Sequence, residues 1–582
     1  MAENHPKQDF ENFNLEKSGN AKVAKKLASK ANKKIQNLLI KGHSHQLKSE
    51  WEQAAKYYLE AWDYDLENLD ILTLVAYVLS QLGVRDKAIA VLEKALSIHG
   101  PTNAICQIMG LLCMEMSIFD TAEKIWAQAI QMNPQNRSAY VNYASALYKQ
   151  EKYEEAINFC QEVLPVFPDY SDLWNVLGTA VQYGRDATES IVFYEEATRL
   201  DPENYKAFSN LAIVEPSLEK RIDYNRKAIA IKPDCSEAHL GLAYLLLYQG
   251  KLEEAWQHYE WRLLSTRGAG QNLVYSVDMP KWEGESLADK TILVAAEQGV
   301  GDEIFFARAI EQLEAKAGRV ILSCDERLQD IFQRSFPDVV CISYENFDSH
   351  GYLYRHFPQL KQDERLKGLP VDYYTPAASL PRFFWQDMSE IPAYGTGYLV
   401  PDPARVATWK DRVGRLGQGL KVGISWQSSN LMHDRKLLYT VLDDWQALFE
   451  ALPDAHFINL QYGDVEEQLQ LAEKKFGVTI HRWDDLDLKQ DLEANLALMA
   501  NLDAVVGPST ATQAMSIASG VKTCMPIRGR PWWCFGMPVM AQKLPFMPNL
   551  KFFDIFWGET WSDSIVRVAE ELQLLLNEKT KI

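Results

Sequence analysis

The first half of the chain repeats one pattern of apolar, small and polar positions at a fixed interval. Prolines stand 34 residues apart at 134, 168 and 202, and a further one follows after 31 residues at 233. In the period that begins at Ser171, apolar and small residues hold fixed places, namely Trp174, Leu177, Gly178, Tyr194, Ala197 and Pro202. Small residues let two helices approach closely and proline ends the second one, so each period predicts a pair of helices.

This spacing is the tetratricopeptide repeat (TPR) pattern. Steps of 34 residues in both directions reach matching residues, among them Ala54, Tyr58, Ala88, Trp126, Ala228 and Tyr259. About seven units over 35–263 are predicted to stack into an all-α, right-handed superhelix, because each unit must bury its apolar face against its neighbours. The groove of a TPR array usually receives a peptide or another protein, so we expect a protein partner there.

From Thr291 onward, short runs of β-branched and apolar residues alternate with helical stretches. The runs lie at 291–296, 319–324, 338–343, 397–400, 421–426, 456–461, 503–507 and 522–527. Strand–helix alternation predicts parallel sheets. Because the stretch 345–395 shows no clear strand–helix unit, we predict two doubly wound sheets with a cleft between them. The expected domains are a basic arm (1–34), the repeats (35–263), a linker (264–290) and two Rossmann-like domains (291–400 and 401–582).

Charge and composition narrow the range of partners. The chain has 60 Lys and Arg against 79 Asp and Glu, and its net charge of −19 argues against nucleic acid as a partner. It contains no apolar run long enough for a membrane span and does not begin with a signal-peptide pattern, so we predict a cytoplasmic protein. The eight cysteines lack the spacing of metal ligands, so no metal site is expected.

Ligands of parallel sheets bind beyond the carboxyl ends of the strands, so the chemistry is expected in the loops that follow them. The first such loop, 297–303, places the carboxylates of Asp302 and Glu303 at the start of a helix. Acidic side chains there can face a cleft and act on a ligand. Helix capping by Asp302 is the alternative interpretation.

Two further loops carry groups that suit an anion. Loop 425–436 combines hydroxyls with positive charge, and loop 507–512 combines hydroxyls with the positive end of a helix. The side chains concerned are His433, Arg435 and Lys436 in the former, and Ser509, Thr510 and Thr512 in the latter. A solvated basic loop and simple N-capping are the respective alternatives. The Trp532–Trp533 pair that follows fits either core packing or stacking on a sugar or a base.

Together these motifs resemble a known family, the bacterial TPR proteins fused to a GT-B glycosyltransferase, which is similar to the heptosyltransferase and O-GlcNAc transferase group. The matching segments are 279–310, 371–384, 421–436, 502–520 and 557–572. The resemblance implies an α/β GT-B fold after the repeats, with two Rossmann-like domains facing a cleft. It also implies an inverting, metal-independent transfer that uses a nucleotide sugar as co-substrate and no other cofactor.

The resemblance assigns roles to individual residues. Asp302 matches the general base, Arg435 with Lys436 beside it matches the basic residue on the donor diphosphate, and Ser509 and Thr510 match the helix start that holds the donor. The donor-binding residues expected are Gly301, Trp426, Ser428, Arg435, Lys436, Pro508, Ser509, Thr510 and Thr512. Many relatives have Asp-Thr followed by His in the third loop, whereas this chain reads GPSTATQAM, a departure that bears on the identity of the sugar.

The sequence therefore predicts a protein O-glycosyltransferase that moves a sugar to Ser or Thr of an acceptor held in the TPR groove. Relatives with this layout include flagellin glycosyltransferases, so the resemblance implies flagellin as the acceptor and a nonulosonic sugar such as pseudaminic acid. Two alternatives stay open. One is transfer to a saccharide or a lipid-linked acceptor, and the other is a non-catalytic scaffold built on the TPR repeats.

Overall fold

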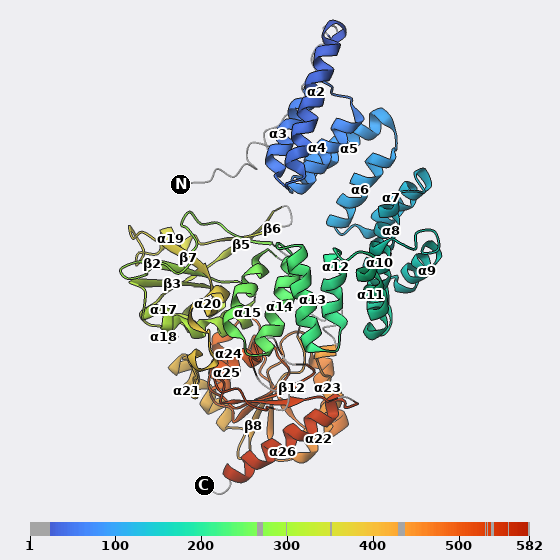
Figure 1. Cartoon of the computed structure of the whole chain (residues 1–582). Coiled ribbons are helices and arrows are strands. Elements are labelled where there is room, and N and C mark those ends of the chain that lie inside the picture. The colour runs from blue at the N-terminus through green and yellow to red at the C-terminus, as the bar shows by residue number, and fades with distance from the viewer. Residues whose placement is uncertain are drawn as a thin grey trace. The chain divides into compact units, whose positions relative to one another are not determined.

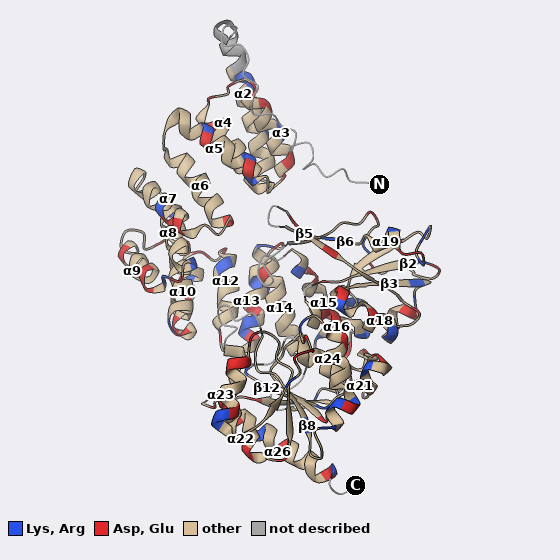
Figure 2. Ribbon diagram, turned by 180° about the vertical axis from the view of Figure 1, so that it is seen from behind, with Lys and Arg blue, Asp and Glu red and all other residues tan. Residues whose placement is uncertain are grey.

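The computed structural model describes residues 24–264, 272–297, 299–349, 352–428, 437–529, 531, 533–536, 541–556 and 558–579. Residues 1–23 of the predicted basic arm lie outside this part. The chain divides into two compact units, Met1–Gly241 and Leu242–Ile582. The first unit consists of helices, whereas the second combines sheets with helices (Figure 1). Acidic and basic side chains are interspersed over the helices of both units (Figure 2).

The first unit is a series of helix pairs, as the 34-residue period predicts. Its helices are α2 Ala24–Gln46, α3 Trp51–Trp62, α4 Leu69–Gln81, α5 Arg85–His99, α6 Asn103–Glu115, α7 Phe119–Met132, α8 Arg137–Lys149, α9 Tyr153–Val163, α10 Ser171–Gly184, α11 Ile191–Leu200, α12 Tyr205–Val214 and α13 Leu218–Ile231. Consecutive helices pack on one another, and each pair also packs on the next. The prediction of an all-helical repeat superhelix is confirmed.

Small residues of the repeat explain why the helices of a pair pack so closely. A β-carbon on Gly110 would lie 2.5 Å from the Trp126 ring, and one on Gly178 would lie 2.8 Å from the Tyr194 ring. Both aromatic side chains are buried completely or nearly so. A larger residue at either glycine would therefore push two helices apart and open a cavity around the ring.

The second unit starts inside α14 (Ser236–Tyr248) and includes α15 (Leu252–Tyr259) and the short helix η2 (Glu260–Leu263). The last helix pair of the repeat pattern is thus grouped mostly with the sheets that follow it. The stretch 264–290, predicted as a linker, contributes strand β1 (Asn272–Tyr275). This strand pairs with β6 (Tyr352–His356), which forms a hairpin with β5 (Glu345–Ser349). The domain limits drawn from the sequence stay predictions.

The N-terminal lobe of the second unit is built on a four-stranded parallel sheet. Its strands are β2 Thr291–Ala295, β3 Arg319–Cys324, β4 Val340–Ser343 and β7 Tyr373–Pro376, in the order β4-β3-β2-β7. The helices that follow these strands are α16 Val300–Phe306, α17 Ile310–Glu314, α18 Gln329–Ser335, α19 Gln359–Gln362 and α20 Pro381–Phe384. The two central strands, β2 and β3, are almost entirely buried, as expected for a parallel sheet between two helical layers, whereas β4 and β7 at the edges have half of their residues buried.

The C-terminal lobe is built on a six-stranded parallel sheet. Its strands are β8 Lys421–Ile424, β9 His456–Asn459, β10 Ile480–His481, β11 Ala504–Val506, β12 Thr523–Ile527 and β13 Leu550–Asp554. The order β10-β9-β8-β11-β12-β13 is the doubly wound order, in which the first and fourth strands of the lobe are neighbours. The predicted parallel α/β architecture of the second half is confirmed at this level.

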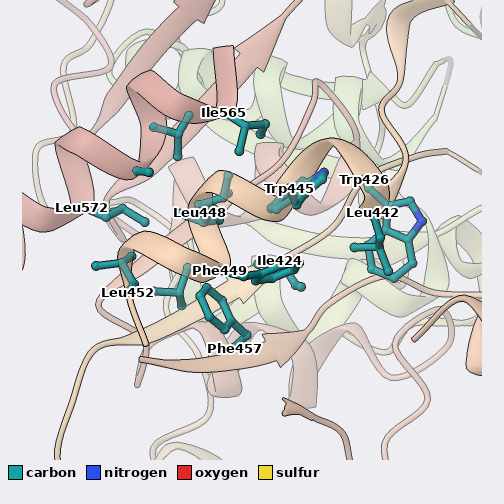
Figure 3. Close-up of a cluster of buried hydrophobic side chains, with 14 of the residues drawn as sticks. Ile424, Trp426, Leu442, Trp445, Leu448, Phe449, Leu452, Phe457, Ile565 and Leu572 are labelled. Carbon is teal, nitrogen blue, oxygen red and sulfur yellow. The ribbon is translucent and has the colours of Figure 1, made fainter. Parts of the chain in front are cut away.

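Helices cover both faces of the six-stranded sheet. They are α21 Pro403–Gly414, α22 Gln446–Ala451, α23 Glu466–Phe476, α24 Leu492–Met499, α25 Ala511–Ala518 and α26 Trp561–Lys579. On one face, α22, α23 and α26 enclose an apolar core with Trp445, Phe449 and Ile565 at its centre (Figure 3). On the other face, α25 packs over β12, where the hydroxyls of Ser516 and Thr523 hydrogen-bond at 2.7 Å.

Two sequence-based expectations for the second unit are wrong. Residues 397–400 are not a strand, because the N–H groups of Tyr398 and Leu399 both donate to the carbonyl of Ala518 (2.8 and 3.0 Å), which ties this segment to the end of α25. The stretch 345–395 does hold a strand–helix unit, since β7 is followed by α20, and it also supplies β5 and β6. Its strand β7 takes the fourth place in the sheet.

None of the helices in the described part of the chain combines the length and the apolar character that a membrane span requires.

Candidate functional site

A cavity of about 510 Å³, called the cleft below, lies between the two parallel sheets of the second unit. Its volume is typical of small-molecule sites. Most of its lining is apolar, with Phe305, Ile517 and Trp533 among the residues that form it. The described residues that line it also include several with polar side chains, among them Asp302, Arg308, Ser509, Thr510 and Arg528. An apolar cavity with a few convergent polar groups is what a binding site requires.

The doubly wound order explains why the cleft opens at this position. Strands β8 and β11 are neighbours, yet the chain leaves β8 toward α22 on one face of the sheet and leaves β11 into α25 on the other. A crevice therefore opens at the carboxyl ends of these two strands. The loop 507–510, which the sequence selects, lies there and carries Ser509 and Thr510 into the cleft.

The start of α25 is held by a buried chain of hydrogen bonds. Thr510 is the N-cap residue, but its hydroxyl makes no cap bond and instead donates to Oε1 of Gln513 (2.5 Å). Gln513 is fully buried and donates through Nε2 to Oγ of Ser425 (2.8 Å). This arrangement fixes the first turn of α25 against the end of β8. The Thr510 side chain therefore makes no cap hydrogen bond to the N–H groups of that turn, which form the positive end of the helix.

We expect Gly507→Ala to break this chain of hydrogen bonds. A β-carbon on Gly507 would lie 2.2 Å from Nε2 of Gln513 and 2.6 Å from Oγ of Ser425. Overpacking of this kind destabilises a domain by about 1–3 kcal/mol, which urea unfolding would measure. Gly414→Ala is the matched control, since no atom lies within 4 Å of its β-carbon, and its stability should stay within about 0.5 kcal/mol of the parent. Equal stability of the two variants would contradict this account.

Asp302 reaches the cleft from the N-terminal lobe. It is the third residue of α16, whose N-cap residue is Gly299, so Asp302 does not hold the N-cap position, although an acid in the first turn still favours the positive end of the helix. Helix α16 packs against α25, which brings the carboxylate and the start of α25 to the same cleft. The charge of Asp302 also affects a side chain of the last helix pair of the repeats, Tyr244 of α14. Burial raises the pKa of Tyr244, and the negative charge of Asp302 raises it further.

Glu303, the neighbour of Asp302, faces a different environment. Its carboxylate accepts hydrogen bonds from the N–H of Asp325 (2.8 Å) and the hydroxyl of Tyr344 (2.9 Å), which lie after β3 and β4. Burial raises its pKa to about 7, although these two hydrogen bonds oppose the increase. Glu303 does not line the cleft, so it is placed to stabilise the N-terminal lobe rather than to replace Asp302.

Several of the donor-binding residues expected from the sequence lie elsewhere. Trp426 is fully buried in the core of the C-terminal lobe (Figure 3), and its Nε1 donates to Oε1 of Gln468 (2.8 Å). Gly301 lines the cleft, whereas Ser428 and Pro508 do not. Thr512 lines a second cavity of about 210 Å³. Arg435 and Lys436, together with His433, fall outside the described residues.

The start of α25 also lines the second cavity, and Ala511 belongs to the walls of both cavities. Val300 and Arg327 of the N-terminal lobe and Tyr462, Leu488, Asn495 and Thr512 of the C-terminal lobe contribute to its walls. Sequence reasoning missed it, because its residues come from five separate segments and form no motif. It also missed Arg308, a buried arginine on the helical stretch after Asp302 whose Nη1 donates to the carbonyl of Phe546 (2.9 Å). Burial lowers the pKa of Arg308.

Among the described residues, no group of three or more His, Cys, Asp or Glu side chains is placed to hold a metal ion. The described residues that line the cleft bring a carboxylate, hydroxyls, guanidinium groups and a helix start to it. Such a set can bind an anion and accept a proton.

Comparisons with known proteins agree with the repeat architecture and identify relatives. Tetratricopeptide repeat models match residues 69–99 and 116–179. The class of protein is thus a TPR protein with a two-lobed α/β unit at its C-terminal end. Protein FlbA of Caulobacter vibrioides is 30% identical over 511 residues, which cover 85% of this chain and 81% of that protein. The chain belongs to the family of Protein FlbA.

Other similarities are more limited. The BBSome complex member BBS4 of Bos taurus is 23% identical over 31% of this chain and 35% of its own length. Protein O-mannosyl-transferase Tmtc3 of Drosophila melanogaster is 28% identical over 18% of this chain and 12% of its own length. Among solved structures, YrrB, described as a TPR protein with an unusual peptide-binding site, is 20% identical with a TM-score of 0.24 and covers 32% of this chain and 96% of its own.

Proposed function

We propose that this chain is a protein O-glycosyltransferase of the GT-B type. One observation carries the proposal: the Asp302 carboxylate from one lobe and the start of α25 from the other line the same cleft. A group that can accept a proton and a group that can bind a phosphate are the two requirements for moving a sugar from a nucleotide to a hydroxyl.

In this proposal the donor lies across the start of α25. Its diphosphate meets the first turn of α25 at Ser509 and Thr510, its sugar enters the cleft of about 510 Å³, and its nucleoside occupies the second cavity of about 210 Å³. This arrangement is supported by the fact that the start of α25 lines both cavities. Arg528, which is exposed, lines the cleft just after β12 and adds positive charge.

The transfer itself follows from these positions. The acceptor hydroxyl attacks the anomeric carbon, its proton passes to Asp302, and the bond from that carbon to the donor phosphate breaks on the opposite side. A single displacement inverts the anomeric configuration. The leaving diphosphate is stabilised by the helix start and by arginine side chains, so the proposal assigns no step to a metal ion.

The acceptor is a protein that the repeats hold, and flagellin is the acceptor that the sequence resemblance favours, with a nonulosonic sugar as the group transferred. The TPR matches support a protein-binding role for the first unit. Tmtc3, which is named as a protein O-mannosyl-transferase, adds limited support because only 12% of its length is matched.

The donor site can be tested by measuring nucleotide-sugar affinity in arginine variants. If Arg435 contacts the diphosphate, Arg435→Ala should lose a charge-assisted hydrogen bond of about 1.5–3 kcal/mol, which weakens the affinity by about 10–150-fold. Calorimetry with a panel of uridine, cytidine and guanosine nucleotide sugars would measure it. Arg415→Ala is the control, since that side chain is 76% exposed and does not line the cleft. An unchanged affinity in Arg435→Ala would assign the contact to Lys436 or Arg528 instead.

A further inference from the structure

A buried ion pair joins the last helix pair of the repeats to the loop that carries Asp302. Arg262, in η2 directly after α15, donates to Glu297 through both Nε (2.9 Å) and Nη2 (2.7 Å). The two side chains are only 6% and 3% exposed. Two parallel hydrogen bonds between a guanidinium and a carboxylate fix orientation as well as distance.

Glu297 connects the ends of two strands of the N-terminal lobe, β2 and β7. It is the second residue after β2, and its carboxylate also accepts from the N–H of Ala378 (2.9 Å), at the start of the turn that follows β7. Arg262 Nη2 reaches the same turn through Oγ of Ser379 (3.0 Å). The pair thus holds together the carboxyl ends of β2 and β7. These two strands are neighbours in the sheet, although they are the first and the last of its strands along the chain.

The charges around the pair are balanced. Arg262 also donates through Nη1 to Glu260 (3.0 Å), and Glu260 accepts from Nζ of Lys281 (2.7 Å). Burial alone would raise the pKa of Glu260, but the two cations outweigh it and lower the pKa to about 2. Burial would likewise lower the pKa of Arg262, whereas Glu297 and Glu260 raise it. These shifts keep Glu260 and Arg262 ionised at neutral pH, and removing one member of the network leaves another charge buried without its partner.

We propose that Arg262 is a positioning residue that fixes the start of the loop 297–302 and so directs Asp302 into the cleft. In this proposal the last helix pair of the repeats, α14 and α15, helps to position the catalytic loop in addition to any role in holding an acceptor. The same helix pair supplies Tyr244 and Tyr259, and Asp302 lies close enough to contribute to the raised pKa of both phenols, for which burial is the main cause. The effect on turnover rests on the proposed transferase function, but the effect on the loop does not.

Two variants separate positioning from stability. Arg262→Met leaves the Glu297 carboxylate buried and unpaired, so it should lower the melting temperature as well as release the loop. The double variant Arg262→Met/Glu297→Leu removes both charges and should recover the melting temperature. It should still exchange the backbone amides of 299–306 about tenfold faster than the parent in hydrogen–deuterium exchange. Transfer should fall by about 10–100-fold, because a small displacement of a catalytic group suffices for such a loss.

Arg567 and Glu559 provide a matched control. They form a bidentate pair in the C-terminal lobe (3.0 and 2.8 Å), and neither residue lines the cleft. Arg567→Met/Glu559→Leu should show the parent's exchange at 299–306 and the parent's turnover. If Arg262→Met/Glu297→Leu also exchanges 299–306 at the parent's rate, the positioning role is wrong, whatever its turnover. If the parent transfers no sugar, the proposed function fails, and the exchange rates still decide the role of Arg262.

Discussion

Replacing Asp302 by Asn is expected to slow sugar transfer by about 10²–10⁴-fold, the usual contribution of a general base. The amide has nearly the shape of the carboxylate but cannot accept a proton at neutral pH. Because Asn can accept the same hydrogen bonds through its carbonyl oxygen and Gly299 is the N-cap residue of α16, the melting temperature should hold. Donor affinity should also hold, since we propose that the other lobe binds the donor phosphates.

The measurement is the initial rate of transfer together with thermal unfolding and donor calorimetry on the same preparation. Asp330→Asn is the control, since Asp330 is an exposed acid in the first turn of α18 and does not line the cleft. It should keep the parent's rate. A well-folded Asp302→Asn with full turnover would remove Asp302 from the mechanism, and Glu303 is not placed to replace it, because its carboxylate is used within the N-terminal lobe.

Trp256→Ala is expected to destabilise the second unit by about 3–5 kcal/mol, the usual cost of truncating a buried tryptophan. Trp256 lies on α15, is 1% exposed and donates through Nε1 to the carbonyl of Trp385 (2.8 Å). Its ring packs edge-on against Trp385 and Phe535, which belong to different parts of the α/β unit. Truncation leaves a large cavity and an unpaired carbonyl where the last helix pair joins both lobes.

Differential scanning calorimetry would measure this effect. The transition of the second unit should fall by about 5–10 °C, while that of the first unit should not move. Trp126→Ala is the matched control, because Trp126 is equally buried but lies in the first unit, so it should lower the other transition. A fragment that starts at residue 264 lacks both Trp256 and Arg262, and we expect it not to fold. If Trp256→Ala leaves both transitions unchanged, the last helix pair is not part of the second unit.

The repeat half of the fold could be predicted well from the sequence, since its signal is a spacing repeated many times. A glycine or alanine opposite an aromatic ring, such as Gly178 opposite Tyr194, can serve only one packing geometry. The repeat spacing does not reveal which residues outside the repeats contact the last helix pair, α14 and α15. Trp256 looks like any other repeat residue, but its partner is Trp385, 129 positions away.

The sheets were predicted less completely, because a buried strand carries no periodic signal of its own. β7 reads Tyr-Tyr-Thr-Pro and ends on a proline, which hid it, whereas 397–400 has the composition of a strand but crosses to the end of α25. There, a β-carbon on Gly397 would lie 2.4 Å from the backbone of Ser519, so this close crossing requires glycine.

The sequence predicts those site residues whose position follows from the order of strands and helices. Asp302 and Thr510 both stand at the start of a helix just after a parallel strand, and the structure brings them to one cleft. Trp426 also follows a strand, but its side chain points into the core on the α22 face of the sheet, a choice that depends on strand register. The second cavity could not be predicted, because it depends on how separate segments of both lobes meet.

The most direct test of the central claim is the intact mass of flagellin after incubation with the full chain and each of a panel of nucleotide sugars. The account predicts that one donor adds the mass of a single glycosyl residue, or a multiple of it, at Ser or Thr. It also predicts that the addition disappears with Asp302→Asn. No added mass with any donor, from a chain that binds a nucleotide sugar and is correctly folded, would contradict transfer to flagellin. If sugar then appeared only on a saccharide or a lipid-linked acceptor, the assignment of a protein acceptor would be overturned.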